Sequence, residues 1–493
     1  MARSSAWLSL SLSFLVLFNG CLGRQSFHGE QSQNNECQLS DIHPLDLTRF
    51  IPSEAGYTEF WDPDNEQFKC GGALAFRHTI WRNGLLLPSY TNAPLVTYVL
   101  QGSGIFGGIF PGCAETYQES LGDGFLDKHQ KIGSYKQGDI IVLPEGAVHW
   151  LYNNGEEDTV LVVLQHTSND ANQLDDNPLR FFLAGKPLLN PGSSHQGQRE
   201  QGQREQGQQQ HGGQRQELMT ERETKEFGYG GNILAGFDVQ IVKDALNTDR
   251  KTAEKIMGGK GRGHIVNVDP ILLQSIVPSS PSRSEKRRQP GRQGGGSSNA
   301  LEETVCTARF SQNIDNPERA DIYDPQAGRL TTLNSFTLPA LSYVRLSAAR
   351  GFLNKNWGLV PQWSMNAHSF LYVTKGSALI QIVNQRGETI LNEQVREEQL
   401  FLVPQNFAVV KQAGDEGFEW VEFSTNENAM YNTFSGRAST LAGMPADIIA
   451  ASYDLSESQA QNLKENMTSL WFYQASPDSS SRSSSSSGRS AFI

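Results

Sequence analysis

One pattern of short apolar runs, present twice in the chain, limits the possible folds more than any other feature. Runs rich in β-branched and aromatic residues, separated by Gly, Pro and Asn, occupy residues 71–110 and 138–166. The same pattern returns between residues 343 and 423. Short strands with turn residues at this spacing are typical of a β-sandwich or a β-barrel. The sequence therefore predicts a mainly β protein in which one all-β domain has been duplicated.

Each β block is followed by a stretch that favours helix. Residues 445–467 begin with Pro445 and contain Ser456 as a helix cap, and residues 232–257 carry apolar side chains at helical spacing. These apolar side chains are Phe237, Ile241, Ala245 and Leu246. A barrel followed by a small helical extension, twice, is the simplest description.

Three polar segments interrupt this plan. The chain has 493 residues, which is more than one compact domain, yet only 37% of them are apolar. Residues 192–217 are rich in Gln, residues 279–298 in Ser, Arg, Pro and Gly, and residues 479–490 in Ser. Such segments cannot bury enough apolar area to offset the entropy lost on ordering, so we predict linkers or tails. The net charge of -12 argues against nucleic-acid binding, which requires Lys and Arg contacts to phosphates.

The N-terminal residues have the pattern of a secretory signal peptide. Arg3 precedes an apolar stretch from Trp7 to Phe18, and small residues follow at Cys21 and Gly23. The stretch is shorter than the roughly 20 apolar residues of a transmembrane helix, and no later segment is long enough. We therefore predict a signal peptide and no membrane span, with a signal anchor as the alternative.

Cysteine usage fits a secreted protein. Removal of the signal peptide leaves Cys37, Cys70, Cys113 and Cys306. Four cysteines in an oxidising compartment predict two disulfides, and counting alone leaves all three pairings open.

The most specific motif lies in the first β block. Its residues are Gly138, Pro144, Gly146, His149 and Asn153, spaced as G-x5-P-x-G-x2-H-x3-N. This spacing resembles the second sequence motif of the cupin superfamily, which implies a jelly-roll barrel in which the His is one of several metal ligands. The fold expected is therefore two jelly-roll cupin barrels, a bicupin.

The other ligands of a cupin metal site are missing. Metal-binding cupins add an H-x-H pair followed by a Glu, and counting back from Gly102 puts these positions at Pro88, Tyr90 and Leu95. None of these side chains is a suitable ligand. A transition metal needs several nitrogen or oxygen donors, so we predict no metal and a buried, hydrogen-bonded His149.

The second β block has lost even the His. Val409 occupies its position, and the other ligand positions fall at Gln362, Ser364 and Ser369. We therefore expect a metal site in neither barrel.

Three longer runs narrow the family. They are Asn299–Cys306 (NALEETVC), Ala320–Arg329 (ADIYDPQAGR) and Val403–Trp420 (VPQNFAVVKQAGDEGFEW). On these runs, and over nearly its whole length, the chain resembles the 11S globulins, the legumin-type seed storage proteins. The resemblance implies a nitrogen and amino-acid reserve with no catalytic activity and no cofactor.

The resemblance also implies specific processing. It pairs Cys37 with Cys70 and Cys113 with Cys306, and it implies cleavage after Asn299 by an asparaginyl endopeptidase. Ala300 departs from the usual Gly after the processing Asn. Two disulfide-linked chains are expected, assembling alone or with other 11S subunits as trimers and then hexamers in the protein storage vacuole.

The sequence leaves other functions and properties open. A metal-dependent cupin enzyme, such as an oxidase or dioxygenase, and a small-ligand-binding cupin are the alternative functions. Asn466 begins an N-glycosylation sequon, Asn466-Met467-Thr468, whose occupancy the sequence leaves unassigned. Several 11S globulins are food allergens, and the resemblance extends to that property.

The expected organisation has eight segments. We expect a signal peptide at 1–23, an N-terminal cupin barrel at 24–190, a Gln- and Gly-rich disordered insert at 191–230, a helical extension at 231–278, a disordered linker with the processing site at 279–299, a C-terminal cupin barrel at 300–440, a second helical extension at 441–470, and a Ser-rich disordered tail at 471–493.

Overall fold

The computed structural model describes one compact unit in detail, which begins at Leu39. The residues described are 37, 39–110, 113, 116–119, 126–130, 132–174, 177–188, 217–226, 228–273, 276, 305–467, 469 and 471–475. The predicted signal peptide and the residues Asn299 and Ala300 lie outside this part of the chain.

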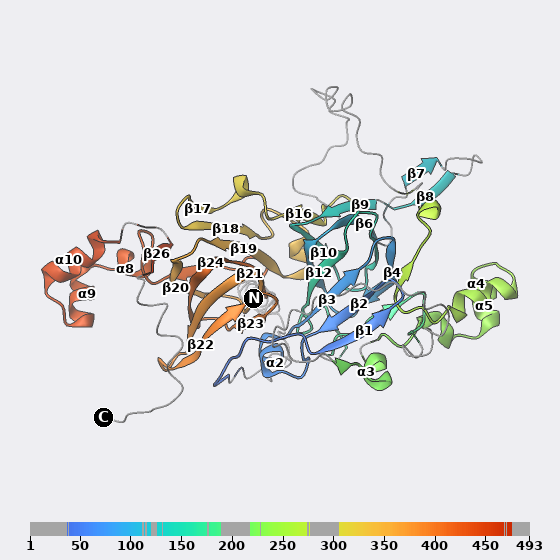
Figure 1. Ribbon diagram of the computed structural model, residues 1–493, viewed down its shortest axis with the longest axis horizontal. Helices are drawn as coiled ribbons and strands as arrows, with labels where there is room; N and C mark the ends of the chain where they lie inside the picture. Colours follow the sequence, from blue (N-terminus) through green and yellow to red (C-terminus); the bar gives the residue numbers. More distant parts are fainter. Residues whose placement is uncertain are drawn as a thin grey trace, which may run out of the picture. The chain divides into compact units, whose positions relative to one another are not determined.

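The first half of the unit folds as a barrel of two sheets (Figure 1). One sheet has the order β14-β1-β2-β3-β12-β5-β10-β16, and the other has the order β13-β4-β11-β6-β9 with β15 paired to β4. The strands are β1 (Arg49–Ser53), β2 (Gly56–Phe60), β3 (Leu74–Ile80), β4 (Gly84–Thr91), β5 (Leu95–Gln101), β6 (Ser103–Ile109), β9 (Ile132–Lys136), β10 (Asp139–Leu143), β11 (Val148–Tyr152), β12 (Thr159–Gln165), β13 (Arg180–Phe182), β14 (Glu217–Leu218), β15 (Ile265–Asn267) and β16 (Ser311–Asn313), with a separate hairpin of β7 (Thr116–Glu119) and β8 (Leu126–His129). Side chains such as Val99, Ile141 and Val163 fill its core, as the β-branched runs predict.

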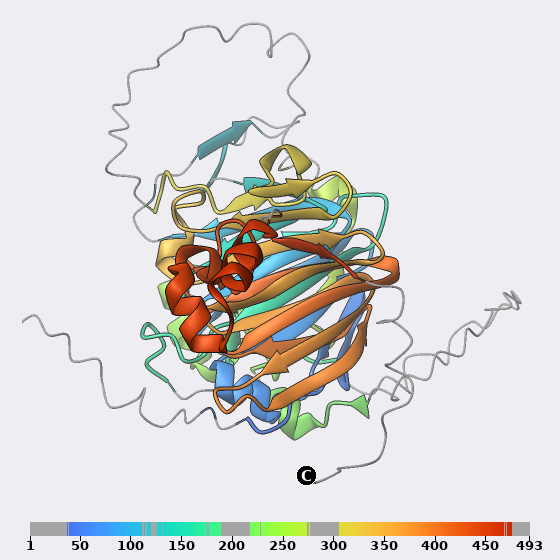
Figure 2. The ribbon, with the colours of Figure 1, turned by 90° about the vertical axis from the view of Figure 1, so that its left-hand side faces the viewer.

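The second half forms another barrel, which faces the viewer in Figure 2. Its strands are β17 (Ile322–Asp324), β18 (Gly328–Leu333), β19 (Ser347–Leu353), β20 (Trp357–Ser364), β21 (Ser369–Val383), β22 (Thr389–Arg396), β23 (Leu400–Val403), β24 (Ala408–Ser424), β25 (Tyr431–Thr433) and β26 (Phe472–Gln474). The long strands β21 and β24 pair with each other along most of their length, and the register of this pairing shifts on both sides of Gly376. Gly376 has φ +73°, and a Cβ there would lie 2.3 Å from the carbonyl oxygen of Gly417, so glycine is required at this bend. The predicted mainly β fold with two jelly-roll barrels is confirmed.

The helices are short and lie mostly in the two extensions. They are α2 (Glu66–Gly71), α3 (Glu221–Glu226), the 3-10 turn η2 (Ile233–Gly236), α4 (Val239–Ala245), α5 (Arg250–Gly258), α6 (Pro270–Leu273), the 3-10 turn η4 (Pro317–Arg319), α7 (Leu341–Val344), α8 (Thr440–Gly443), α9 (Ala446–Tyr453) and α10 (Glu457–Glu465). Ser456 caps α10 in a capping box, in line with its predicted role. Among the described residues, no helix combines the length and apolar character needed to cross a membrane.

The apolar side chains at helical spacing in the first extension are exposed and do not form a core. Phe237, Ile241 and Leu246 are 55%, 60% and 51% exposed, whereas Val242 is the buried residue of α4. The extension therefore presents apolar side chains to its surroundings.

The two halves exchange segments. The amide of Ile42 donates to the carbonyl of Ile390 at 2.9 Å, and the Ile42 side chain lies in the core of the C-terminal barrel. In return, β16 from the C-terminal half pairs with β10 of the N-terminal barrel. We call this arrangement the segment exchange. It differs from the expected boundaries, because a sequence pattern identifies a strand without identifying the sheet that accepts it.

Two further boundaries also differ from expectation. Residues expected in the disordered insert form β14 and α3, and Met219 and Tyr229 nearby are 5% and 3% exposed. The expected tail likewise contributes β26, which pairs with β20 and buries Phe472. In both places a few apolar side chains are enough to order a segment whose average composition is polar.

A buried arginine lies at the contact of each barrel with the other. Arg77 on β3 forms ion pairs with Glu59 at 2.7 Å and with Glu398 of the C-terminal half at 2.6 Å. Arg350 on β19 forms ion pairs with Asp315 and Glu419, both at 2.8 Å. Each guanidinium thus joins carboxylates from two parts of the fold, an arrangement that fixes the barrels relative to each other.

Candidate functional site

The interior of the N-terminal barrel holds His149, the histidine of the sequence motif, beside a buried arginine. His149, on β11, is 1% exposed, and its ring Nδ1 lies 3.0 Å from the carbonyl oxygen of Ala147. A neutral imidazole in this position donates from Nδ1, which leaves the Nε2 lone pair as an acceptor. Nη1 of Arg180 lies 3.4 Å from Nε2 and donates to Ser89 Oγ at 3.0 Å. A guanidinium therefore occupies the space in front of the ring nitrogen that a metal would use.

The first-motif positions are displaced by one residue from the sequence-based assignment. His149 pairs with Ser89 in the β4–β11 register, and Ser89 and Thr91 are the buried residues in the second half of β4. Pro88 and Tyr90 point to the other side, where the Tyr90 ring stacks on Phe181 at 5.0 Å.

Leu95, by contrast, lies in the barrel core at 1% exposure. Three residues connect Thr91 to Leu95, whereas the expected positions Tyr90 and Leu95 are separated by four residues. This difference of one residue explains why the expected positions Pro88 and Tyr90 face away from the interior. Ser89 and Thr91 are weak metal ligands compared with the His pair of a metal-binding cupin, so the corrected positions still do not supply a donor set.

Two more histidines lie in the same interior, and sequence reasoning missed both. Nδ1 of His78 lies 2.8 Å from Thr58 Oγ1, and the ring of His264 stacks on Phe182 at a centroid distance of 3.9 Å. Neither gave a specific sequence signal, because His78 stands between Arg77 and Thr79 in LAFRHTI of β3 and His264 precedes the short strand β15. Arg180 gave no signal at all.

Burial keeps these histidines neutral. Burial first, and then the charge of Arg180, lowers the pKa of both His149 and His264 to about 3. The same causes lower the pKa of His78 well below its ordinary value. A neutral His can ligate a metal, but the described residues contain no group of three or more His, Cys, Asp or Glu side chains placed to hold one. The residues present therefore do not fit the metal centre that the cupin fold can carry.

The interior of the C-terminal barrel also contains a side-chain cation. Gln362 lies opposite Val409, which stands at the position of the motif His, and both are buried. Lys411 Nζ lies 3.5 Å from Glu422, and the Tyr431 hydroxyl donates to the same carboxylate at 2.6 Å. Although burial raises the pKa of Glu422, the charge of Lys411 and these hydrogen bonds hold it below its ordinary value. Ser364 and Ser369, at the other expected ligand positions, are 2% and 1% exposed in this interior.

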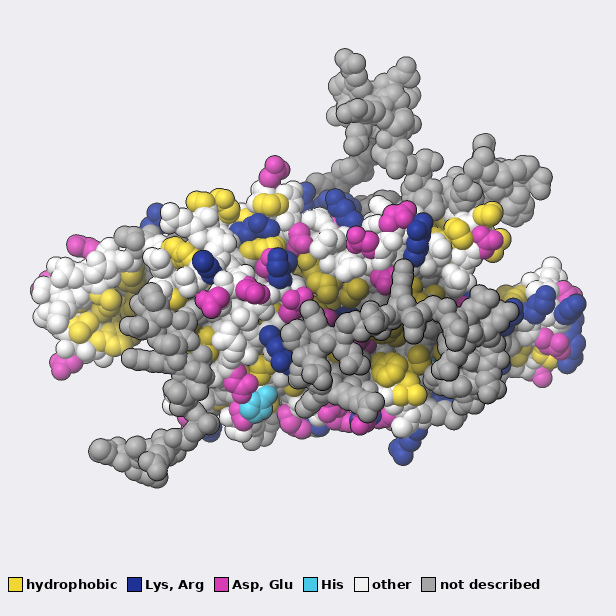
Figure 3. All heavy atoms as spheres, in the orientation of Figure 1, with side chains coloured by type: hydrophobic (Ala, Val, Ile, Leu, Met, Phe, Trp, Pro, Cys, Tyr) yellow, Lys and Arg dark blue, Asp and Glu magenta, His cyan; other side chains and the backbone are white. Residues whose placement is uncertain are grey.

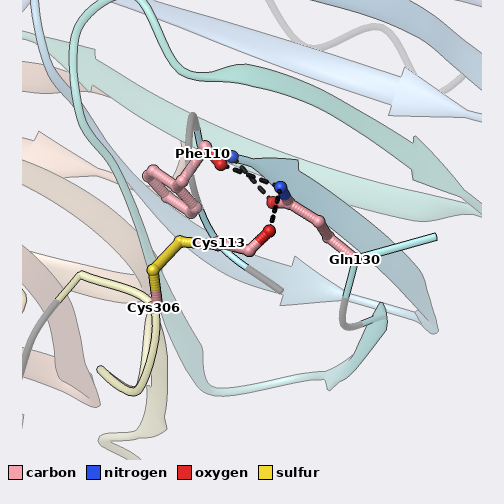
Figure 4. The surroundings of a disulfide bond; sticks show 4 residues. All are labelled: Phe110, Cys113, Gln130 and Cys306. Carbon is pink, nitrogen blue, oxygen red and sulfur yellow. Dashed lines mark hydrogen bonds between the residues drawn. A yellow bond between two sulfur atoms is a disulfide. The ribbon is translucent and has the colours of Figure 1, made fainter. Parts of the chain in front are cut away.

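One disulfide links the two halves of the chain. Cys113 and Cys306 are bonded across a sequence separation of 193 residues, as Figure 4 shows. Gln130 stabilises the surrounding loop, because its side-chain amide exchanges hydrogen bonds of 2.8 Å with the backbone of Phe110. The ring of Phe110 stacks on Phe310 of the other half at 4.7 Å. The bond joins the two cysteines that the resemblance pairs.

The remaining expected sites are less completely described. Cys37 and Cys70 are each disulfide-bonded. Asn466 is the exposed C-cap residue of α10, while Thr468 of its sequon lies outside the described residues. The pairing of Cys37 with Cys70 and the glycosylation of Asn466 remain predictions.

Comparison with known proteins agrees with the fold and with these interiors. The family model described as Cupin matches residues 44–188 and 312–461. The 11S globulin of Juglans nigra is 42% identical over 514 residues, covering 98% of each chain. Legumin A of Gossypium hirsutum is 43% identical, covering 94% of this chain and 96% of its own. The structure of the recombinant pro-11S globulin of pumpkin matches with a TM-score of 0.74 at 37% identity, covering 89% of this chain and 100% of its own.

These observations define the class as a bicupin in which side-chain cations occupy the barrel interiors. Within that class, the chain belongs to the 11S globulin family of seed storage proteins. Storage of amino acids in the seed is the function of this family, and the chain shares it.

Proposed function

We propose that this globulin is stored as two disulfide-linked chains produced by cleavage between Asn299 and Ala300. The single observation that carries the proposal is the Cys113–Cys306 bond, which spans the proposed cut. Cleavage of the chain between two halves that are bonded and that exchange segments leaves the folded unit intact. The similarity to a pumpkin protein named as a pro-form supports a precursor stage.

The reserve itself is a bulk property of the chain. Ten Gln residues lie between Gln196 and Gln216, and each carries a side-chain nitrogen. Segments of this composition expose their backbone to proteases more readily than compact barrels do. Nitrogen can therefore be mobilised from the polar segments first and from the barrels later.

The cleavage proposal predicts a specific gel pattern. Mature seed protein should run as one species on a denaturing gel without reductant and as two smaller species with reductant. A Cys113→Ser variant should give two species under both conditions, and an Asn299→Gln variant should remain a single chain under both. A reduced mature protein that still runs at the full precursor mass would contradict the proposal, and so would cleavage that persists in Asn299→Gln.

We further propose assembly into trimers and then hexamers, alone or with other 11S subunits, in the protein storage vacuole. Both helical extensions expose large apolar side chains, including Phe237 and Ile241 in the first and Ile448 and Tyr453 in the second. Apolar faces at two different places on one subunit favour a head-to-tail contact that closes into a ring. Figure 3 shows apolar side chains on the visible face of both extensions. The predicted signal peptide supports entry into the secretory pathway.

The barrel interiors support the proposal of a non-catalytic role. The Nε2 atom of His149 faces Arg180, and the second barrel has Val409 in place of the His. Elemental analysis of purified protein should therefore find transition metal well below one equivalent per chain. One equivalent of zinc, iron, copper or manganese that is lost in a His149→Gln variant would favour the alternative of a metal-dependent cupin enzyme.

A further inference from the structure

Among the described residues, Arg180 differs from the other buried arginines because it has no carboxylate partner. Arg77 and Arg350 each form two ion pairs with carboxylates. Arg180 is 4% exposed, and within the described part of the chain its hydrogen bonds reach only Ser89 and His149. Both partners are neutral. An arginine stays protonated in proteins, so the barrel interior carries one positive charge that its own residues do not balance.

The histidines around Arg180 cannot supply the missing negative charge. Imidazole is either neutral or positive, and burial first, and then the charge of Arg180, keeps His78, His149 and His264 neutral. Within the described part of the chain, the rings of Phe76 and Phe182 also lie near the guanidinium, with centroids 5.7 and 5.9 Å from its central carbon. Aromatic faces attract a cation, but they replace only part of the hydration that a buried ion loses.

A small cavity lies next to the unbalanced charge. Its volume is about 10 Å³, and its lining includes Arg180, Tyr229 and Gln165 among the rings of Phe60 and Phe76. Both Nη1 hydrogen bonds of Arg180 are used, whereas Nε and Nη2 donate to no described residue. The guanidinium thus retains donors beside a space bounded mainly by apolar groups.

Tyr229 supplies a second free donor at this cavity. Its hydroxyl is buried and has no hydrogen-bond partner among the described residues. Burial raises the pKa of Tyr229, while Arg180 and the nearby Thr58 oppose that shift; Thr58 is close enough to act on the pKa without meeting the geometry of a hydrogen bond. The phenol is therefore protonated and able to donate. Two donors without acceptors among the described residues, on side chains that line one cavity, are the arrangement of an anion site.

We propose that a single monatomic anion, chloride under ordinary conditions, binds in this cavity between Arg180 and Tyr229. The charge of Arg180 requires a negative partner, and the free donors of both residues hydrogen-bond it. The volume selects its size, because a cavity of about 10 Å³ holds one particle close to the size of a water molecule. Sulfate, phosphate and organic carboxylates are too large for it.

Bromide provides a direct test, since it resembles chloride and scatters anomalously. Crystals of the wild-type protein grown in sodium bromide should show an anomalous peak within hydrogen-bonding distance of Arg180 and of the Tyr229 hydroxyl. The peak should weaken or vanish in a Tyr229→Phe variant. Electron density for a water molecule at this position, with no anomalous signal in bromide, overturns the proposal.

Thermal unfolding provides an independent test in solution. Replacing gluconate by chloride at constant ionic strength should raise the Tm of the wild-type protein by about 2–5 °C, because the ligand binds only the folded state. Tyr229→Phe should reduce this shift, and Arg180→Met should abolish it. A matched control is Tyr135→Phe, which removes a buried hydroxyl of the same barrel whose neighbours are Tyr152 and Thr159, and it should keep the full shift. Equal shifts in Tyr229→Phe and Tyr135→Phe would contradict the proposal even if Arg180→Met fails to fold.

Discussion

Lowering the pH from 7 to 4.5 is expected to reduce the free energy of unfolding by about 5 kcal/mol through His149 and His264 alone. The pKa of each is about 3 in the folded protein, against the ordinary value of 6.5. Below pH 6.5 the unfolded chain therefore binds protons that the folded barrel does not bind. Stability falls as the pH drops from 6.5 and stops falling near pH 3, where the folded state also becomes protonated.

Urea unfolding at several pH values between 7 and 4.5 measures this effect. His149→Gln and His264→Phe should each make the pH dependence shallower, by about 2.5 kcal/mol over this range. His43→Gln is the matched control, because His43 is exposed and its pKa is raised by Glu393 instead of being lowered by burial. If the wild-type protein is equally stable at pH 7 and pH 4.5, the buried histidines accept protons in the folded state and the interpretation is wrong.

Removal of Arg350 is expected to destabilise the protein by about 3–5 kcal/mol. An Arg350→Met variant removes the cationic partner of the Asp315 and Glu419 carboxylates at the contact between the barrels, and the Nη1 hydrogen bond to the carbonyl of Trp420 at 3.0 Å is also lost. The loss of stability comes mainly from carboxylates that remain partly buried without a cation, and less from the lost attraction to Arg350. The shift of the urea midpoint at pH 7 measures it.

Arg345 offers a matched control for this prediction. It forms an ion pair with Asp170 on the surface, where the two side chains are 56% and 62% exposed. Arg345→Met should cost less than about 1 kcal/mol. Adding Asp315→Asn and Glu419→Gln to Arg350→Met should recover part of the loss. Similar losses for Arg345→Met and Arg350→Met would mean that burial of the Arg350 cluster has no energetic consequence.

The sequence predicted those parts of the fold that depend on local chemistry. Strand periodicity predicted the two barrels, and the chemistry of Ser456 predicted the start of α10. The motif around His149 also predicted a buried and hydrogen-bonded ring. One reason for the motif is visible at Gly138, which has φ +84° and where a Cβ would lie 2.7 Å from the Cβ of Asp315. Local rules of this kind can be read from one sequence.

The parts that could not be predicted depend on contacts between distant segments. Arg180 lies on β13, 31 residues after His149, and no spacing rule connects the two. The displacement from Pro88 and Tyr90 to Ser89 and Thr91 arose from the length of one connection, which decides which face of a strand points inward. The segment exchange could not be predicted for a similar reason, because the sequence of a strand does not identify the sheet that it joins.

The segment exchange has a consequence for the order of events in the life of the protein. The core of the C-terminal barrel includes Ile42, and the N-terminal sheet includes β16, so neither product of the proposed cut contains a complete barrel. Before the cut, folding is intramolecular, and the covalent connection between the halves keeps their effective concentration high. Once the protein has been cut, reduced and unfolded, the two pieces would have to find each other in solution. With the proposed cut, we therefore expect the native structure to form at the precursor stage, and the cut, reduced and unfolded protein to refold much more slowly.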